Sequence, residues 1–194
     1  MTDMSPFLQH VFHDARTANG FLPKPVSDAQ LQAIYDVAKM GATSMNTQPA
    51  RYVFLRTPEA RARLLPCLSP GNVAKVEQAP VTVIVANDTR FFDQLPHIWH
   101  VPNAKDMFEN NAALSQATAF RNATLSGAYF MIAARALGLD CGPMSGFDAA
   151  KVNAEFFPDG QWQANFLINL GHADTSKTFA RNPRLSFEQA CRLL

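Results

Sequence analysis

Cysteine is scarce in this chain of 194 residues, which contains only Cys67, Cys141 and Cys191. The three lie far apart and no C-x-x-C pair occurs, which argues against a disulfide scaffold and against a structural zinc site. Free thiols are typical of a reducing compartment, so a cytoplasmic protein is expected. The first residues also lack the basic and apolar regions of a secretory signal.

Neither an excess of one charge nor a long uninterrupted apolar run is present. The 17 Lys and Arg residues nearly balance the 16 Asp and Glu residues, which argues against binding to nucleic acid or to an anionic membrane. The most apolar stretch, residues 111–137, is interrupted by Arg121, Asn122 and Arg135, whereas a membrane span needs about 20 predominantly apolar residues. With 47% hydrophobic residues, the chain is expected to form one globular domain over residues 1–194.

Common catalytic motifs are missing as well. The apolar run Val81–Ala86 is followed by Asn-Asp-Thr-Arg rather than by a G-x-G-x-x-G turn, and neither a P-loop nor a G-x-S-x-G elbow occurs. His97 and His100 stand three apart among prolines, where an ordinary loop is a better interpretation than a metal site. Cys141 has no histidine nearby in the sequence to lower its pKa, so a buried apolar role is favoured over a nucleophile.

Apolar spacing predicts helices that alternate with a few strands. Helical periodicity and capping residues predict helices over residues 7–16, 28–39, 58–65, 111–137, 148–156 and from 186 to the end. Apolar runs predict strands at 52–55, 80–86 and 165–170, with an irregular aromatic segment at 91–108 and a turn-rich crossing at 140–147. The 111–137 helix is apolar nearly all round, which is typical of a helix inside a domain or in a subunit interface. The fold class is therefore α+β or α/β.

Four short segments are rich in polar side chains, and each has an ordinary explanation when taken alone. Arg16–Asn19 follows the first helix, where a cation suits the helix dipole. Thr43–Pro49 is a loop whose side chains can close turns. Asn72–Lys75 precedes the first core strand and Lys177–Arg184 follows the last one. Solvated surface cations would explain both of these.

Together these segments carry a longer pattern. The motifs R-S-x-R-x-F, P-S-S-x-N-x-Q-P-W, N-x-x-K-V, P-x-x-G-F-D and R-x-P correspond, with substitutions, to residues 16–21, 42–50, 72–76, 143–148 and 181–183. In order and spacing, from residue 13 to the end, the chain resembles the nitroreductase family of FMN-dependent oxidoreductases. Asn19 departs from the pattern, because the family carries a cation at that position.

The resemblance implies a fold and an assembly. It implies an α+β, nitroreductase-like fold with a central mixed sheet flanked by helices. It also implies an intertwined homodimer that binds FMN at the interface between its two subunits. Within the family, segments 14–20, 134–148 and 183–190 are most similar to the enzymes that reduce malonic semialdehyde in the Rut pathway of pyrimidine degradation.

The same resemblance implies which residues bind FMN. The phosphate would be bound by Arg16, Thr17, Arg181 and, as a further candidate, Lys177. Asn72 and Lys75 would meet the pyrimidine edge of the ring, where a cation or amide favours reduction. Other contacts would come from Pro143, Met144, Ser145 and Gly146 and, in the partner subunit, from Thr43, Ser44 and Asn46. Because Asn19 is uncharged, Arg184 or Lys177 would have to compensate at the phosphate.

The implied activity is ping-pong hydride transfer from NADH or NADPH through FMN to a substrate, with malonic semialdehyde giving 3-hydroxypropionate. No catalytic side chain is required for it, and the sequence does not choose between the two nicotinamide donors. Arg121, a charge in an otherwise apolar helix, would bind the substrate carboxylate or contact the cofactor; an ion pair between subunits explains it equally well. The aromatic segment 91–108 would form a lid or substrate wall, or simply pack.

Three other functions remain open at this stage. The first is a broad-specificity reductase of nitroaromatics, quinones or enals, which would use the same FMN site. The second is a flavin-binding or redox-sensing module without physiological turnover. The third is a structural protein that binds no flavin.

Overall fold

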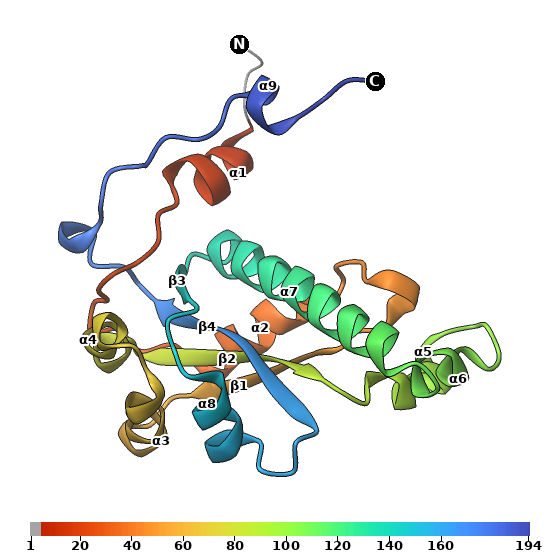
Figure 1. The fold of residues 1–194 in the computed structure, drawn as a ribbon. Helices are drawn as coiled ribbons and strands as arrows, with labels where there is room; N and C mark the ends of the chain where they lie inside the picture. The colour runs from red at the N-terminus through yellow and green to blue at the C-terminus, as the bar shows by residue number, and fades with distance from the viewer. Residues whose placement is uncertain (1–4) are drawn as a thin grey trace.

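Four strands form one antiparallel sheet in the computed structural model, which describes residues 5–194 (Figure 1). In spatial order they are β1 (Ala50–Leu55), β2 (Val81–Asp88), β4 (Trp162–Gly171) and β3 (Asp140–Met144). The expected α+β class is confirmed. The expected mixed sheet is wrong, because the connections from β1 to β2 and from β3 to β4 each reverse the chain, and all three described pairings are antiparallel.

Helices cover both faces of this sheet. The helices are α1 (Pro6–Leu8), η1 (Gln9–Asp14), α2 (Asp28–Ala38), α3 (Pro58–Leu64), α4 (Pro70–Gln78), α5 (Leu95–Ile98), α6 (Ala104–Glu109), α7 (Ala112–Ala136), α8 (Ala149–Phe156) and α9 (Phe187–Ala190), with short 3-10 turns between them. Ser27 starts α2 with a capping box, as its position before an apolar periodic run predicts.

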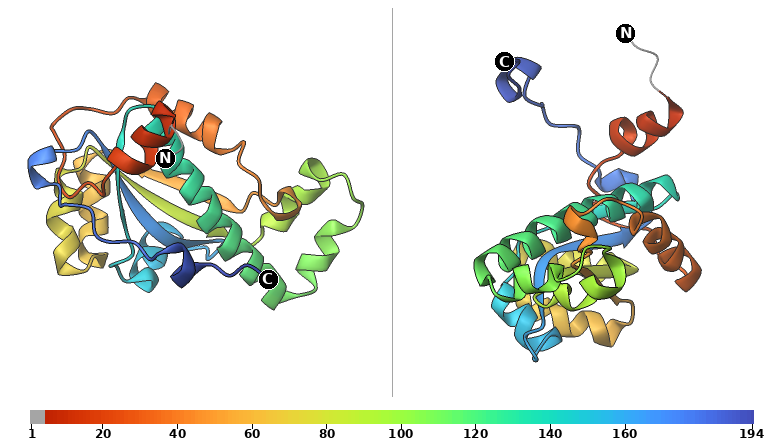
Figure 2. Two further views of the ribbon diagram at one scale, coloured as in Figure 1. Left: turned by 90° about the horizontal axis from the view of Figure 1, so that it is seen from above. Right: turned by 90° about the vertical axis from the view of Figure 1, so that its right-hand side faces the viewer.

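Neighbouring residues of β2 point into two separate cores. Val83 packs with Ile34 of α2 and Phe130 of α7. Ile84 faces the other way and packs with Leu64 of α3 and Val152 of α8. Because both faces are covered, every residue of β2 is buried. Figure 2 shows these helix layers on opposite sides of the sheet.

The longest helix, α7, has 25 residues, and local sequence sets both of its ends. The Asn111 side chain accepts a hydrogen bond from the backbone N–H of Leu114 at 3.0 Å, and Gly138 follows the helix with a φ of +81°. One side of α7 packs on the sheet. The other side is uncovered in the single chain and leaves Phe120 57% exposed. We call the exposed apolar residues Leu114, Phe120 and Leu125 the outer strip of α7.

Several segments differ from the sequence-based expectations. The expected turn-rich crossing contains β3, because residues 140–144 pair with β4. No helix was predicted for residues 70–78, which form α4 and contain Asn72 and Lys75, with Pro70 in its first turn. The last helix was expected to reach the end of the chain but stops at Ala190, because the exposed residues around it offer no core to pack on.

The aromatic segment 91–108 is largely helical rather than irregular. It forms a 3-10 turn at Phe91–Gln94, then α5 and α6. Phe91, Phe92 and Phe108 are buried in a small core of their own, with Phe91 and Phe108 in edge contact at 5.0 Å between ring centroids. Packing therefore accounts for most of the aromatic content of this segment.

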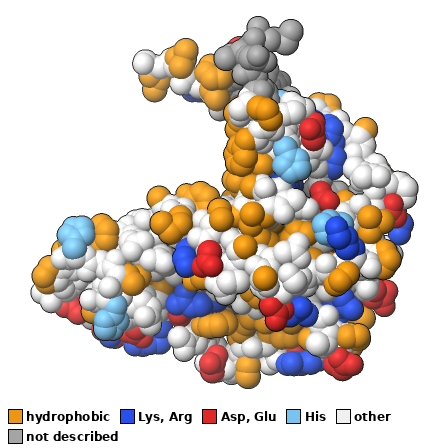
Figure 3. All heavy atoms as spheres, turned by 180° about the vertical axis from the view of Figure 1, so that it is seen from behind, with side chains coloured by type: hydrophobic (Ala, Val, Ile, Leu, Met, Phe, Trp, Pro, Cys, Tyr) orange, Lys and Arg blue, Asp and Glu red, His pale blue; other side chains and the backbone are white. Residues whose placement is uncertain are grey.

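The two ends of the chain leave the body together on the α7 side (Figures 1 and 2). We call residues 5–14 and 178–194 the arm. Large apolar side chains of the arm are exposed, including Phe12 at 48% and Phe187 at 57%. Seen from behind, hydrophobic side chains line the inner side of the arm where it curves over the body (Figure 3). Across residues 5–194, no helix combines the length and apolarity needed to cross a bilayer.

Candidate functional site

A cavity of about 570 Å³ opens where the arm joins the body. Its lining comes from residues 12–19, the last turn of α7 and residues 179–184. We call it the basic cavity, because four arginines line it: Arg16, Arg135, Arg181 and Arg184. Three residues expected to bind one phosphate are therefore brought into a single lining: Arg16, Thr17 and Arg181, although Arg181 lies more than 160 positions after the other two.

The arginines of the basic cavity outnumber the acids near them, of which Asp14 acts on Arg181. None of its four arginines forms an ion pair with a carboxylate in the described part of the chain. Loss of hydration lowers the pKa of the Arg181 guanidinium, and the positive charges of Arg16, Arg184 and Arg135 lower it further. Guanidinium groups gathered in this way favour an anion with several oxygens, such as a phosphate.

Backbone carbonyls at the end of η1 hold two of these arginines in place. Arg181 donates from Nη2 to the carbonyl oxygens of Phe12 at 2.6 Å and His13 at 2.7 Å. Arg16 donates from Nη1 to the same His13 carbonyl at 2.7 Å and to that of Ala15 at 2.9 Å. A helix carries partial negative charge at its C-terminal end, which suits both cations. These bonds use one nitrogen of each guanidinium and leave its other N–H groups free.

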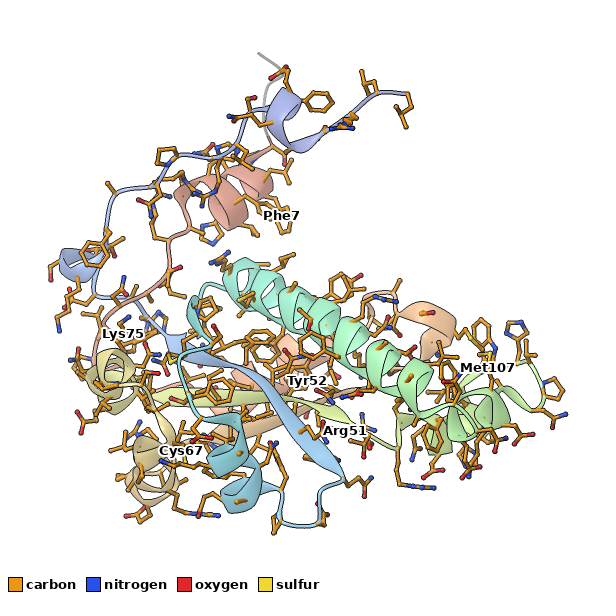
Figure 4. The ribbon with its side chains drawn as sticks, in the orientation of Figure 1. Phe7, Arg51, Tyr52, Cys67, Lys75 and Met107 are labelled. Atoms are coloured by element: carbon orange, nitrogen blue, oxygen red, sulfur yellow. The ribbon has the colours of Figure 1, made fainter. Side chains whose placement is uncertain are left out.

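A second group of expected site residues lies where β3 ends beside α4. The Asn72 side chain donates from Nδ2 to the Gly146 carbonyl at 2.9 Å, and the Ser69 backbone N–H donates to the same oxygen at 3.0 Å. A Cβ at Gly146 would lie 2.7 Å from Asn72 Nδ2, so a larger residue there would have to displace the Asn72 side chain. Lys75, one helical turn beyond Asn72, makes no hydrogen bond or ion pair with any described residue (Figure 4).

Strand β3 joins the two groups. The backbone N–H of Ala18 donates to the Cys141 carbonyl at 3.0 Å, which fixes residues 16–19 against the strand. At Gly142 a Cβ would lie 2.5 Å from the Ala18 carbonyl oxygen, so only glycine allows this approach. The basic cavity thus lies near the start of β3 and the Met144–Gly146 turn at its end. An elongated ligand with an anionic end could reach both along the strand.

The third group, Thr43, Ser44 and Asn46, lies elsewhere. The Ser44 backbone N–H donates to Asn122 Oδ1 of α7 at 2.9 Å, and Asn46 Nδ2 donates to the Ile98 carbonyl at 2.9 Å. The loop around them holds non-glycine residues at positive φ: Met45 (50°), Asn46 (53°) and Gln48 (42°). Such conformations are strained and cluster at ligand sites.

Within one chain, this loop does not reach the basic cavity. It is anchored at Asn122, whereas Arg135 lines the cavity 13 positions further along α7, which is about 20 Å at the rise of an α-helix. Lys177 is also absent from the cavity lining. Its Nζ donates to Gln78 Oε1 at 2.9 Å and forms an ion pair with Asp174 at 3.7 Å.

Other side chains singled out in the sequence are placed as follows. Arg121 is exposed on α7 and has no hydrogen bond or ion pair with residues 5–194. Burial raises the pKa of the Cys141 thiol to about 12, which suits a buried apolar residue rather than a nucleophile. His97 lies at the end of the short helix α5, and the described residues hold no group of three His, Cys, Asp or Glu suited to a metal ion.

Arg135 is the one of the four cavity arginines that the sequence did not assign to the site. It was seen only as a charge that interrupts an apolar stretch. Its neighbours Ala133 and Ala134 are buried, while Arg135 itself is half-buried and faces the basic cavity. A charge in the last turn of a long helix is normally solvated, so the sequence alone gives no signal for this role.

Comparison with known proteins fits this geometry. The sequence model of the Nitroreductase family matches residues 14–172. The chain belongs to the nitroreductase family. Arg16, Asn72, Lys75 and the 143–148 turn lie within the matched range, whereas Arg181 and Arg184 lie beyond it.

Relatives of this nitroreductase-family chain are similar along nearly their whole length. A Ralstonia nicotianae protein named "Putative NADH dehydrogenase/NAD(P)H nitroreductase" is 54% identical over 187 residues, which is 96% of each chain. A Rhodopseudomonas palustris protein with the same name is 52% identical over 189 residues, covering 97% of this chain and 96% of the relative. A nitroreductase from Exiguobacterium sibiricum, solved in complex with FMN, has a TM-score of 0.89 at 21% identity and covers 100% of this chain and 99% of its own.

Proposed function

We propose that the chain is an FMN-dependent NAD(P)H oxidoreductase and that the FMN phosphate binds in the basic cavity. The observation that carries this proposal is the set of four arginines that line one cavity and form no ion pair with a carboxylate among residues 5–194. FMN brings a phosphate dianion, and guanidinium groups match its oxygens. Arg16, Thr17 and Arg181 would hold that phosphate. Lys177 would not, because it already contacts Gln78 and Asp174.

The residues at the other end of β3 suit the flavin ring. Lys75 supplies a cation that has no partner in the described part of the chain, and Asn72 supplies an amide. Both suit the polar pyrimidine edge. Pro143, Met144, Ser145 and Gly146 bring backbone groups near the remaining edge, because the Gly146 turn packs closely on α4. Bound FMN supplies the chemistry, taking hydride from NADH or NADPH and passing it to a second substrate. The residues of the chain bind, orient and tune, and no nucleophile is needed.

An intertwined homodimer completes this proposal. Thr43, Ser44 and Asn46 sit on a strained loop about 20 Å along α7 from the basic cavity of their own chain, so a second copy is the natural source of these contacts. The arm and the outer strip of α7 expose large apolar side chains, as a subunit interface does. In this proposal each chain forms a single domain, and its three free thiols suit the cytoplasm.

The substrate we favour is malonic semialdehyde. Segments 14–20, 134–148 and 183–190 support it, because they resemble the malonic semialdehyde reductases of pyrimidine catabolism. The reaction adds hydride to the aldehyde carbon and a proton from water to its oxygen, which gives 3-hydroxypropionate. The substrate carboxylate requires a cation, and Arg121 is exposed on α7 with its charge unused by the described residues. We assign the carboxylate to Arg121.

A comparison of aldehydes tests this assignment. Propionaldehyde has the same three carbons as malonic semialdehyde but lacks the carboxylate. For Arg121→Ala we expect KM for malonic semialdehyde to rise about tenfold, with KM for propionaldehyde unchanged, because a charge-assisted hydrogen bond is lost. Arg63→Ala on α3, at the opposite face of the sheet, is the matched control and should change neither KM. Equal KM values for the two aldehydes in the unmodified enzyme would contradict the substrate assignment.

A broad nitroaromatic or quinone reductase is the second candidate, and the names of the two relatives favour it. The same assays decide between the candidates. A value of kcat/KM for nitrobenzene or a quinone far above that for malonic semialdehyde would support the broad reductase. A flavin-binding module without turnover would instead reduce none of these compounds at an appreciable rate with NADH or NADPH.

A further inference from the structure

The phosphate site lacks one cation that its sequence motif leads one to expect. Asn19 stands at the position where the family pattern has a cation. Its side chain lines the basic cavity but is neutral, and among the described residues its Nδ2 donates only to the Thr17 carbonyl at 3.3 Å. A phosphate dianion placed there therefore needs its positive charge from another part of the chain.

Two cations suggested by the sequence are poorly placed for this task. Lys177 lies outside the cavity lining and is held by Gln78 and Asp174. Arg184 does line the cavity, but it is exposed on the arm, and its Nη1 donates to the carbonyls of its own neighbours Asn182 at 2.8 Å and Pro183 at 3.2 Å. Its position thus depends on residues of the arm that are exposed and do not pack against the core.

Arg135 lines the cavity, lies on a helix that the core holds in place, and has little else to bind. It belongs to α7, whose adjacent residues Ala133 and Ala134 are buried against the sheet, so its backbone is fixed by the core. Within residues 5–194 its guanidinium makes only one long hydrogen bond, 3.5 Å from Nη1 to the Val11 carbonyl. A smaller neighbouring cavity also places Asp14 and Asp140 near Arg135, yet neither forms an ion pair with it. The charge of Arg135 is therefore available to a ligand.

We propose that Arg135 supplies the cation that Asn19 does not, and that it binds the FMN phosphate from the last turn of α7 together with Arg16 and Arg181. The proposal rests on the proposed function, since it requires FMN in the basic cavity. In this proposal the phosphate is bound from three parts of the chain: Arg16 near the N-terminus, Arg135 on α7, and Arg181 near the C-terminus. The charge around Arg181 supports the same placement, because Arg135 is one of three arginines that lower the pKa of Arg181, and Asp14 opposes them without cancelling their effect.

Flavin binding by the full-length apoprotein tests this role without any turnover. Riboflavin is the matched ligand, because it has the ring and ribityl chain of FMN but no phosphate. The measured quantity is the ratio of the riboflavin Kd to the FMN Kd, from fluorescence titration. For Arg135→Gln we expect this ratio to fall about tenfold or more while the riboflavin Kd stays unchanged, because only the phosphate contact is lost.

Two further variants make the result specific to position 135. In Asn19→Arg/Arg135→Gln a cation returns to the same cavity, so we expect the FMN preference to recover. Arg184→Gln should lower the preference less than Arg135→Gln does. If Arg135→Gln leaves the preference unchanged, or if Arg184→Gln lowers it more, the inference is wrong while the proposed function stands. If the unmodified apoprotein binds neither flavin, the proposed function fails and this inference with it.

Discussion

Gly142→Ala is expected to lower the midpoint of thermal unfolding by roughly 4–10 °C and to weaken FMN binding, although alanine adds only a methyl group. That methyl carbon would lie 2.5 Å from the carbonyl oxygen of Ala18. The oxygen belongs to the backbone, so no side-chain rotation relieves the clash. The hydrogen bond from the Ala18 N–H to the Cys141 carbonyl must stretch or break instead. Arg16 and Thr17 would then move out of the basic cavity.

A second glycine provides the control for this substitution. Gly71 lies in α4, and a Cβ added there would meet no heavy atom within 4 Å. Gly71→Ala should therefore unfold at the same temperature as the unmodified protein or slightly higher, because alanine is favoured over glycine in a helix. Calorimetry and FMN titration of both variants separate a local clash from a general effect of the added methyl group. Equal midpoints for the two variants would contradict the close contact between β3 and residues 16–19.

Phe12→Ser/Phe187→Ser is expected to convert a dimer into a monomer. Both side chains are about half exposed in the single chain, so a monomer should tolerate the change well. In an intertwined dimer with two-fold symmetry the double variant removes four large apolar side chains from the interface. Each contributes about 1.5–3 kcal/mol when buried, so the dimer dissociation constant should rise by about a thousandfold or more. Sedimentation velocity at micromolar protein concentration measures this directly.

Met40 supplies the control for the loss of an exposed apolar side chain. It is 80% exposed, follows α2 and is not part of the arm. Met40→Ser should leave the sedimentation coefficient unchanged. If the unmodified protein sediments as a 21.4 kDa monomer, the dimer proposal is wrong. If the double variant sediments as a dimer, the arm does not form the interface.

Local physics explains why many elements could be predicted from the sequence. Short stretches of sequence determine several of their ends: the capping box at Ser27, Pro58 in the first turn of α3, and the limits of α7 at Asn111 and Gly138. The buried strand β2 follows from its apolar run. The sheet is different, because β3 is made by pairing with β4 about 30 residues away, and the Gly-Pro content of residues 140–147 indicated a turn.

Some residues of the candidate site could likewise be predicted from the sequence, whereas others depend on how distant parts of the chain come together. The resemblance to the nitroreductase family implied that Arg16, Thr17 and Arg181 meet, and the structure places all three in one cavity lining. Arg135 could not be found in this way, because nothing in the sequence around it tells which side of α7 faces the cavity. The position of Lys177 beside Gln78 likewise depends on how the chain crosses after β4. The grouping of Thr43, Ser44 and Asn46 with the other residues requires a second chain and stays a prediction.

The absorption spectrum of the purified protein tests the central claim most directly. A bound flavin absorbs near about 450 nm, where protein alone is transparent. We expect a yellow preparation whose band at this wavelength bleaches rapidly when NADH or NADPH is added without oxygen, and recovers when an aldehyde or nitro substrate follows. A colourless protein that takes up no added FMN would contradict the account, because the four arginines of the basic cavity would then serve no flavin phosphate.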